Sequence, residues 1–401
     1  MMRLLSLFFA VLLIVPVSAQ KKEISQARSD IKNRTNLDKA EASMRSLLND
    51  SANRRNVKIY VTLAEAVRAQ YEVANEKMYL KEKYDTVAFF NTVRRMFQAY
   101  ESLDSVEMLP DRKGRVKVRL RKKNAVYLNR YRRNLYNGGI FFVAKKNYAD
   151  AFSLFDTYID CRRQPLFSAS PDVESDSLYN SAAFWTVFCG YMLSRPDSTL
   201  MYSGLALSDK RYRQRTLIFV ADAYLQKRDT VKYVETLRSG FFENKNSKFF
   251  FTRLMDYYNS TNKLDSAMSI VNAALSGDGG NPLFLFAKSN LLLNMGKYAD
   301  CIAISDTLIA RNDTVPEVFL NAGVSYMNLA LALEKDLKAG KYENKTIIGY
   351  YKKALPYMEK YRALAPEDKE RWAQSLYNIY LKLNMGRQFE EVTAILKKMR
   401  E

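Results

Sequence analysis

The side chains that most often carry out chemistry near neutral pH are scarce in this 401-residue chain. It contains no histidine, so it lacks the commonest general base, the usual partner of serine and cysteine nucleophiles, and the usual zinc ligand. It has no glycine-rich phosphate-binding motif, and its one glycine cluster, from Gly277 to Gly280, is typical of a turn between helices. Its acidic residues are scattered. We therefore predict a protein that is not an enzyme and that binds no cofactor or metal.

Three cysteines remain as reactive groups, at Cys161, Cys189 and Cys301. Their odd number excludes a fully paired disulfide framework, and their spacings match no zinc motif. An oxidising compartment leaves a Cys161–Cys189 disulfide open. A small buried thiol on a helix is the commoner role, and we favour it for each cysteine.

The densest group of charged side chains is basic. No acidic residue lies between Asp111 and Asp150, and like charges at this density repel one another unless an anion or an acidic neighbour offsets them. The formal net charge of +20 makes acidic neighbours scarce. Interleaved aliphatic residues predict a loop followed by one long helix. The candidates for contact with an anionic partner are Arg112, Lys113, Arg115, Lys117, Arg119, Arg121, Lys122, Lys123, Arg132 and Arg133. The alternative is an ordinary solvated basic face.

The amino-terminal residues resemble a secretory signal peptide. Arg3 precedes an apolar run from Leu4 to Val15, and Val17-Ser18-Ala19 fits a cleavage site between Ala19 and Gln20. The alternative is a transmembrane anchor, but the run is shorter than the roughly 20 residues that span a bilayer. No later stretch is apolar for long enough to span. We therefore predict an exported, periplasmic and envelope-associated protein, for which nucleic acid is the least expected partner.

A 34-residue period organises the rest of the chain. Leu217, Phe251, Leu285 and Phe319 follow one another at this spacing, and the same holds for Tyr224, Tyr258, Leu292 and Tyr326. The low glycine and proline content favours helices over many short strands. The predicted fold class is all-α.

Within this period, large and small residues alternate in a pattern that resembles the tetratricopeptide repeat (TPR) family. One unit carries Phe319, Ala322, Gly323 and Tyr326, and another carries Leu135, Gly139, Phe142, Tyr148 and Ala151. The resemblance implies an α-solenoid of helix-turn-helix repeats that is degenerate in its N-terminal half. The expected organisation is a signal peptide over residues 1–19, degenerate helical repeats over 20–110, a long basic helix with divergent repeats over 111–213, and TPR-like repeats over 214–401 with an insertion near 330–349.

The TPR resemblance also implies a concave groove that binds an extended peptide. On this register the groove candidates are Arg133, Tyr136, Phe184, Phe188, Tyr191, Arg215, Asn259, Asn290, Asn294, Tyr377 and Tyr380. Asparagine amides can hydrogen-bond a peptide backbone, and aromatic rings offer a large contact area at low entropic cost. The alternative is that these residues solvate a helix face, or that Phe184 and Phe188 belong to the core.

A recurring pattern of an aspartate, then serine or threonine, then an aliphatic residue, alanine, methionine or threonine is similar to the O-glycosylation sequon of secreted Bacteroidetes proteins. It occurs at Asp50, Asp85, Asp104, Asp176, Asp197, Asp229, Asp265, Asp306 and Asp313. Because aspartate, serine and threonine also cap helix starts, most of these pairs have a sufficient structural reason as well.

Together, these observations predict an exported scaffold or adaptor that binds a partner protein or peptide in an envelope assembly, secretion or uptake system. The alternative is a structural protein whose basic region binds anionic lipid or polysaccharide, either as an envelope polymer or as a membrane surface. Salt separates the two, because binding to a polyanion weakens as salt screens the charges.

Overall fold

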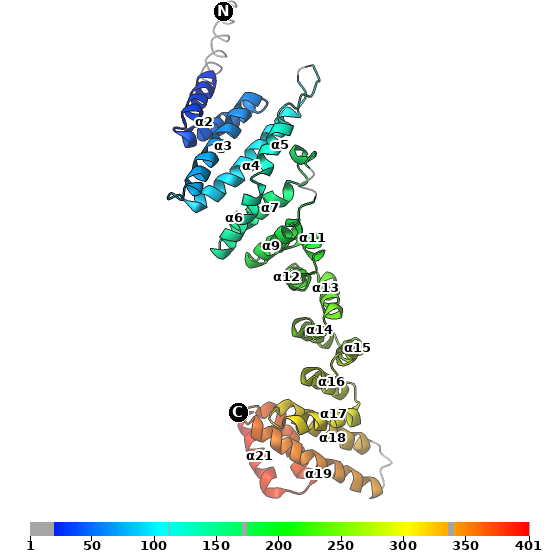
Figure 1. Ribbon diagram of the computed structural model, residues 1–401. Coiled ribbons are helices and arrows are strands. Elements are labelled where there is room, and N and C mark those ends of the chain that lie inside the picture. Colours follow the sequence, from blue (N-terminus) through cyan, green and yellow to red (C-terminus); the bar gives the residue numbers. More distant parts are fainter. Residues whose placement is uncertain (1–19, 112, 171–174, 336–340, 401) are drawn as a thin grey trace, which may run out of the picture. The chain divides into compact units, whose positions relative to one another are not determined.

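The computed structural model describes residues 20–111, 113–170, 175–335 and 341–400, and every regular element within them is helical (Figure 1). The all-α fold class is thus confirmed. The signal peptide with Ala19, and Arg112 of the basic stretch, lie outside the described residues. Gln20 begins a helix over residues 20–33. The chain divides into unit 1, which ends at Tyr233, and unit 2, which begins at Val234.

Unit 1 is a succession of packed helices in which α3 lies against both α2 and α4, and α7 packs between α6 and α9. After the helix over residues 20–33, its elements are α2 (Leu37–Asn49), η1 (Ser51–Asn53), α3 (Val57–Tyr79), α4 (Thr86–Glu107), α5 (Arg121–Asn129), α6 (Arg132–Ala144), α7 (Tyr148–Asp160), η2 (Pro165–Phe167), α9 (Tyr179–Met192), α10 (Pro196–Met201), α11 (Ser203–Leu207) and α12 (Arg213–Gln226).

Helix α13 (Thr230–Glu243) crosses the division between the units, and the helices that follow it up to α16 alternate between two rows. Figure 1 shows α14 and α16 in one row, with α13 and α15 in the other. Further along the chain, α17 packs between α16 and α18, and α20 packs between α19 and α21. The bounds are α14 (Lys248–Ser260), α15 (Leu264–Leu275), α16 (Pro282–Asn294), α17 (Tyr298–Arg311), α18 (Pro316–Lys335), α19 (Lys341–Leu364), α20 (Lys369–Lys382) and α21 (Gly386–Lys398).

Small residues let the two helices of a repeat approach closely. A Cβ atom on Gly139 of α6 would lie 2.5 Å from the ring of Phe155 on α7, and one on Gly323 would lie 2.6 Å from Met358 Sδ. Ala151 and Ala267 are fully buried. The large-small alternation of the sequence is therefore the packing code of TPR-like helix pairs.

The insertion near residues 330–349 lengthens two helices. Helices α18 and α19 have 20 and 24 residues, whereas α16 and α17 have 13 and 14. The residues between them, 336–340, lie outside the described part of the chain. The repeat register therefore continues past the insertion because the extra residues extend an existing helix pair.

The basic stretch forms two helices, so the prediction of one long helix is wrong. Helix α5 ends at Asn129, and α6 begins at Arg132 after a turn at Arg130 and Tyr131. At this turn the Tyr131 ring packs against Tyr71 and Tyr127, with ring centroids 4.9 and 5.2 Å apart. These aromatic contacts accompany the break in the helix, and the hydrophobic spacing alone does not reveal them.

Several of the aspartates that precede serine or threonine act as helix caps. Asp85 Oδ1 accepts hydrogen bonds from the backbone N–H groups of Val87 and Ala88 at 2.9 and 3.0 Å, at the start of α4. Asp50 caps η1 in the same way. Asp104 and Asp306, by contrast, lie inside α4 and α17, so a capping role is wrong for those two. Glycosylation of these pairs stays a prediction.

All three cysteines are buried and unpaired. The disulfide left open between Cys161 and Cys189 is not formed, and the interpretation as buried thiols is correct. Burial raises the pKa of the Cys189 thiol to about 12, so the group is neutral at physiological pH.

Candidate functional site

A concentration of exposed positive charge lies on the loop between α4 and α5 and on helix α5 itself. Figure 1 shows this loop projecting from the end of α4. The loop is organised by a tight turn in which the Gly114 N–H donates to the Asp111 carbonyl at 2.9 Å and the Asp111 N–H donates to the Arg115 carbonyl at 2.9 Å. Gly114 has a φ of 73°, a left-handed conformation that a residue without a Cβ adopts at no steric cost.

Asp111 is the side chain that holds this turn. Its carboxylate accepts the backbone N–H groups of Lys113 and Arg115 at 2.8 and 3.0 Å. The same carboxylate contacts the guanidinium of Arg115 at 3.3 Å and the ammonium of Lys117 at 3.8 Å. The Arg115 backbone N–H and these further contacts lower the pKa of Asp111. Sequence reasoning treated Asp111 only as the edge of the basic stretch and missed this role.

Two of the predicted anion contacts are instead structural ion pairs. Arg121 forms a two-pronged pair with Asp104 of α4, with both N···O distances at 2.8 Å, and the Asp104 side chain is only 3% exposed. The prediction that Arg121 contacts an anionic partner is therefore wrong, because its guanidinium already faces a carboxylate from another part of the chain. The same holds for Arg132, which lies 2.8 Å from Asp176 and stacks over the Tyr158 ring.

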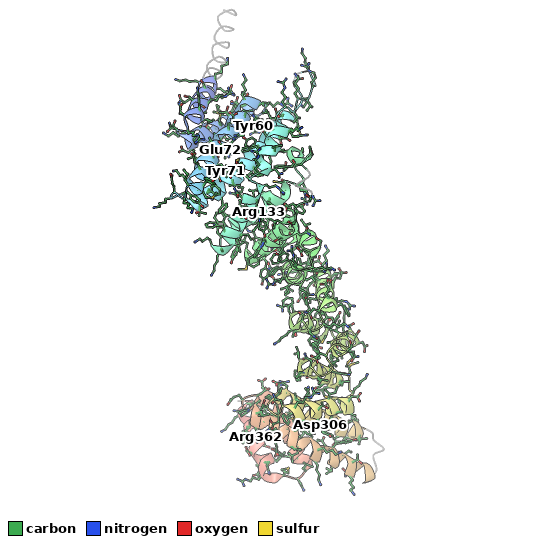
Figure 2. The ribbon with its side chains drawn as sticks, viewed as in Figure 1. Tyr60, Tyr71, Glu72, Arg133, Asp306 and Arg362 are labelled. Atoms are coloured by element: carbon green, nitrogen blue, oxygen red, sulfur yellow. The ribbon has the colours of Figure 1, made fainter. Side chains whose placement is uncertain are left out.

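The other cations of the stretch stay available. Lys113, Arg119, Lys122, Lys123 and Arg130 are exposed, and none forms an ion pair with any residue that the structure describes. We call these five residues the basic surface. Arg133, on the neighbouring helix α6, is also exposed (Figure 2).

Part of the basic surface is hollow. A cavity of 580 Å³, here called the α5 cavity, is lined by Arg68, Arg119, Lys122, Lys123, Asn124, Val126, Tyr127 and Arg130. The Tyr127 hydroxyl donates to Glu72 Oε1 at 3.1 Å, and the guanidinium of Arg68 lies 4.0 Å from the centre of the Tyr127 ring. Burial and the nearby Glu72 raise the pKa of Tyr127, so the phenol stays neutral. The cavity combines an aromatic wall with cations that can attract an anion.

Most of the aromatic groove candidates pack against other side chains of the protein. Phe184 is 3% exposed and stacks on Tyr212, with ring centroids 4.3 Å apart, and Tyr380 is 2% exposed. Both are core residues, so the prediction that they line an open groove is wrong for them. Tyr136 donates or accepts a hydrogen bond with Ser181 Oγ at 2.9 Å and packs against Phe155.

The other aromatic candidates are half-buried against neighbours. Phe188 and Tyr191 both contact the ring of Phe219, at centroid distances of 5.8 and 4.5 Å, and Tyr377 contacts Phe389 at 4.7 Å. These contacts leave only part of each ring to a ligand. The three side chains therefore stabilise helix pairs whether or not a peptide binds.

The polar groove candidates are more accessible. Arg215, Asn259 and Asn294 are exposed. Asn290 is half-buried, and its Oδ1 already accepts a hydrogen bond from Asn321 Nδ2 at 2.6 Å. Asn290 therefore has its two N–H groups and one remaining lone pair of its carbonyl oxygen to offer a ligand.

Comparison with known proteins was made at three levels. No family model matches the sequence, and no curated protein does. Among solved structures, the chain is similar to the C-terminal part of a TPR repeat-containing protein from Cytophaga hutchinsonii, at 9% identity and a TM-score of 0.42, covering 64% of this chain and 92% of that one.

Two further similar structures are also described as TPR proteins. A tetratricopeptide repeat protein from Parabacteroides merdae shares 14% identity at a TM-score of 0.36, covering 66% of this chain and 99% of that one. A TPR repeats protein from Bacteroides fragilis shares 18% identity at a TM-score of 0.32, covering 66% and 98%. The described residues form helices throughout, and the close large-small packing of their helix pairs resembles that of the TPR family.

Proposed function

We propose that the protein is a binding scaffold that docks an acidic segment of a partner protein on the basic surface. The observation that carries this proposal is the set of five exposed cations on the loop and α5 that have no acidic partner among the described residues. Holding such cations together is unfavourable by itself, so an anion that binds there relieves their mutual repulsion.

The distribution of charge supports the same surface. Most of the formal net charge of +20 lies in unit 1, where the basic surface is found, whereas unit 2 is closer to balanced. An acidic partner is therefore attracted to unit 1 over a distance of about a Debye length, roughly 8 Å at physiological salt. The exposed groove candidates Asn259 and Asn294 provide a second, weaker contact in unit 2.

The proposal includes export and a place in the cell envelope, as part of an assembly, secretion or uptake system. Its support is the amino-terminal pattern that ends at Ala19. Among the described residues, no helix is long and apolar enough to cross a membrane. Sequencing of the exported protein from its amino terminus tests the processing: a first residue of Gln20 supports it, and an intact Met1 contradicts it.

A charge-reversed pair tests the docking surface. In Lys122→Glu/Lys123→Glu, binding of a fluorescently labelled oligoglutamate peptide should weaken at least tenfold in 50 mM salt, as measured by anisotropy. The matched control is Lys352→Glu/Lys353→Glu, which reverses two adjacent exposed lysines on α19 in unit 2. It changes the net charge equally and should alter the affinity less than twofold.

Two outcomes would overturn the proposal. Equal weakening in both variants means that net charge alone attracts the peptide. Binding to anionic vesicles or to an acidic polysaccharide, without measurable binding to the peptide, instead supports a structural protein of the envelope. Circular dichroism of each variant verifies that the helices remain intact.

A further inference from the structure

A second hollow lies beside the basic surface, between the start of α3 and the loop that follows α4. It measures 690 Å³ and is here called the loop cavity. Its lining residues are Ala52, Arg55, Asn56, Val57, Val106, Glu107, Leu109, Pro110, Asp111, Arg115, Lys117 and Arg119. The residues just before α3 and the residues just after α4 thus line the same recess.

The charged residues of the loop cavity fall into two classes. Arg115 and Lys117 face the carboxylate of Asp111, and the Glu107 carboxylate accepts the Leu120 backbone N–H at 3.1 Å. Arg55 and Arg119 form no ion pair with the described residues, and Arg55 is exposed on the turn before α3. The cations that remain free are therefore Arg55 and Arg119.

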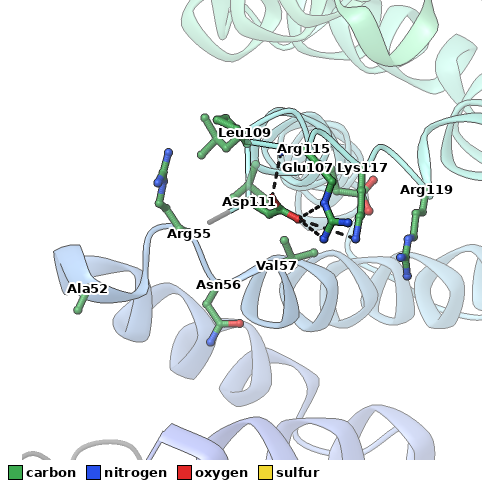
Figure 3. A pocket seen from close by; sticks show the side chains of 12 residues that line it. Ala52, Arg55, Asn56, Val57, Glu107, Leu109, Asp111, Arg115, Lys117 and Arg119 are labelled. Atoms are coloured by element: carbon green, nitrogen blue, oxygen red, sulfur yellow. Dashed lines mark hydrogen bonds and ion pairs between the residues drawn. The ribbon is translucent and has the colours of Figure 1, made fainter. Parts of the chain in front are cut away.

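The free cations lie on opposite sides of the cavity. Figure 3 shows Arg55 at one side and Arg119 at the other, with Val57 and the Asp111 cluster between them. The lining also includes the apolar residues Val57, Val106, Leu109 and Pro110. The cavity thus combines apolar lining residues with a free guanidinium at each side and the ion-paired Asp111 cluster between them.

Leu109 gives the lining of the loop cavity an apolar side chain that the fold does not bury. It is 43% exposed on the loop, and Val116, on the same loop, is 55% exposed. An aliphatic group placed against Leu109 and Val57 would remove apolar surface from water. Leaving these side chains exposed adds nothing to the stability of the core.

From this arrangement we propose that the loop cavity binds a peptide segment in which an aliphatic side chain is flanked on both sides by acidic residues. This inference rests on the proposed function and specifies its partner. Each carboxylate pairs with one of the free guanidinium groups, as arginine favours, and the aliphatic side chain packs against the apolar lining residues. Arg119 also lines the α5 cavity, so the acidic stretch can continue along the basic surface.

The concave shape favours a peptide over a membrane. A bilayer presents a broad surface, to which a projecting loop would offer its tip, whereas the free arginines here border a recess. Docking of a lipid surface is therefore the outcome that the experiment below must exclude.

Two labelled peptides of equal charge test the inference, one with the sequence Glu-Glu-Leu-Glu-Glu and one with Glu-Glu-Ser-Glu-Glu. The full-length protein should bind the leucine peptide at least tenfold more tightly by anisotropy, as is typical of an aliphatic group that enters an apolar pocket. Leu109→Ser should abolish that preference. The control Leu225→Ser removes a similarly exposed leucine on α12 and should leave it unchanged.

The arginine at the far side is tested separately. Arg55→Glu should weaken both peptides at least fivefold, whereas the control Arg387→Glu, an exposed arginine on α21, should not. Both arginines lie on exposed positions, so the variants should fold, and unchanged thermal midpoints verify this.

The outcomes separate this inference from the proposed function. If the two peptides bind equally and Lys122→Glu/Lys123→Glu still abolishes binding, the inference fails and docking on the basic surface stands. Binding of neither peptide overturns both. Anionic vesicles that bind more tightly than either peptide, with sensitivity to Leu109→Ser, overturn the peptide in favour of a lipid surface.

Discussion

At the residue scale, Glu101 of α4 is an ionisable group with a strongly raised pKa. One carboxylate oxygen is buried without a hydrogen-bond partner in the described part of the chain. Burial raises the pKa of Glu101 to about 8, and the nearby carboxylates of Asp160 and Asp156 add to the increase. Glu101 is therefore protonated in the folded protein at neutral pH, whereas it is ionised in the unfolded chain.

This shift gives the stability of the protein a pH dependence of known sign. Below about pH 4.5 both states hold the proton, and between there and about pH 8 only the folded state does, so stability falls by up to about 1.4 kcal/mol per pH unit. Glu101→Gln removes this loss. Thermal melts should show the variant more stable than the wild type at pH 8.5, with the difference shrinking toward pH 5. A difference that stays constant across this range would contradict the assignment.

The charge pattern of the sequence points to the cations of the basic surface but not to their ion pairs. No acidic residue follows Asp111 before Asp150, and the role of these cations as contacts for a partner stays a prediction. The pattern did not reveal that Arg121 and Arg132 are neutralised, because their partners Asp104 and Asp176 come from outside the stretch and meet them only in the fold. The position of Arg55 in the lining of the loop cavity was equally hidden, since this residue lies on the turn before α3.

At the element scale, the 34-residue period predicted the helix pairs of the C-terminal half because the packing between helices repeats with the chain. The break between α5 and α6 had no such signal. It coincides with aromatic contacts between Tyr131, Tyr71 and Tyr127, which come from different helices. Local patterns thus define a helix pair, whereas its irregularities depend on distant neighbours.

Two glycines test how closely the helices pack. A Cβ atom on Gly190 of α9 would lie 2.5 Å from the backbone nitrogen of Thr199 on α10, which cannot move aside as a flexible side chain can. Gly190→Ala should therefore lower the free energy of unfolding by about 1–3 kcal/mol. Gly349, inside α19, has nothing within 4 Å of its Cβ position, so Gly349→Ala should raise it by about 0.5–1 kcal/mol. Urea denaturation measures both free energies of unfolding, and a stabilised Gly190→Ala protein or a destabilised Gly349→Ala protein would refute this view of the packing.

At the scale of the whole molecule, stability in a repeat protein is passed between neighbouring helices. Trp372 of α20 is 2% exposed, in the cluster of buried side chains that joins α18 to α21. Trp372→Ala should cost about 3–5 kcal/mol locally. Hydrogen exchange followed by mass spectrometry should show faster exchange in α19, α20 and α21.

The control for this measurement is hydrogen exchange in the helices of unit 1. Because α3 and α4 belong to a different core cluster, their exchange should stay at the wild-type rate in the Trp372→Ala protein. Equal loss of protection in α3 and α4 would mean that the chain unfolds as one cooperative body.

Because its three thiols are buried, the native structure does not depend on the redox state of its surroundings. No bond between Cys161, Cys189 and Cys301 contributes to the fold, and each sulfur is shielded from oxidants and from disulfide exchange. The same native structure should therefore form in a reducing cytosol and in an oxidising compartment, without the help of an oxidase or a disulfide isomerase. Protein produced in either compartment is then equally suitable for measuring peptide binding to the basic surface.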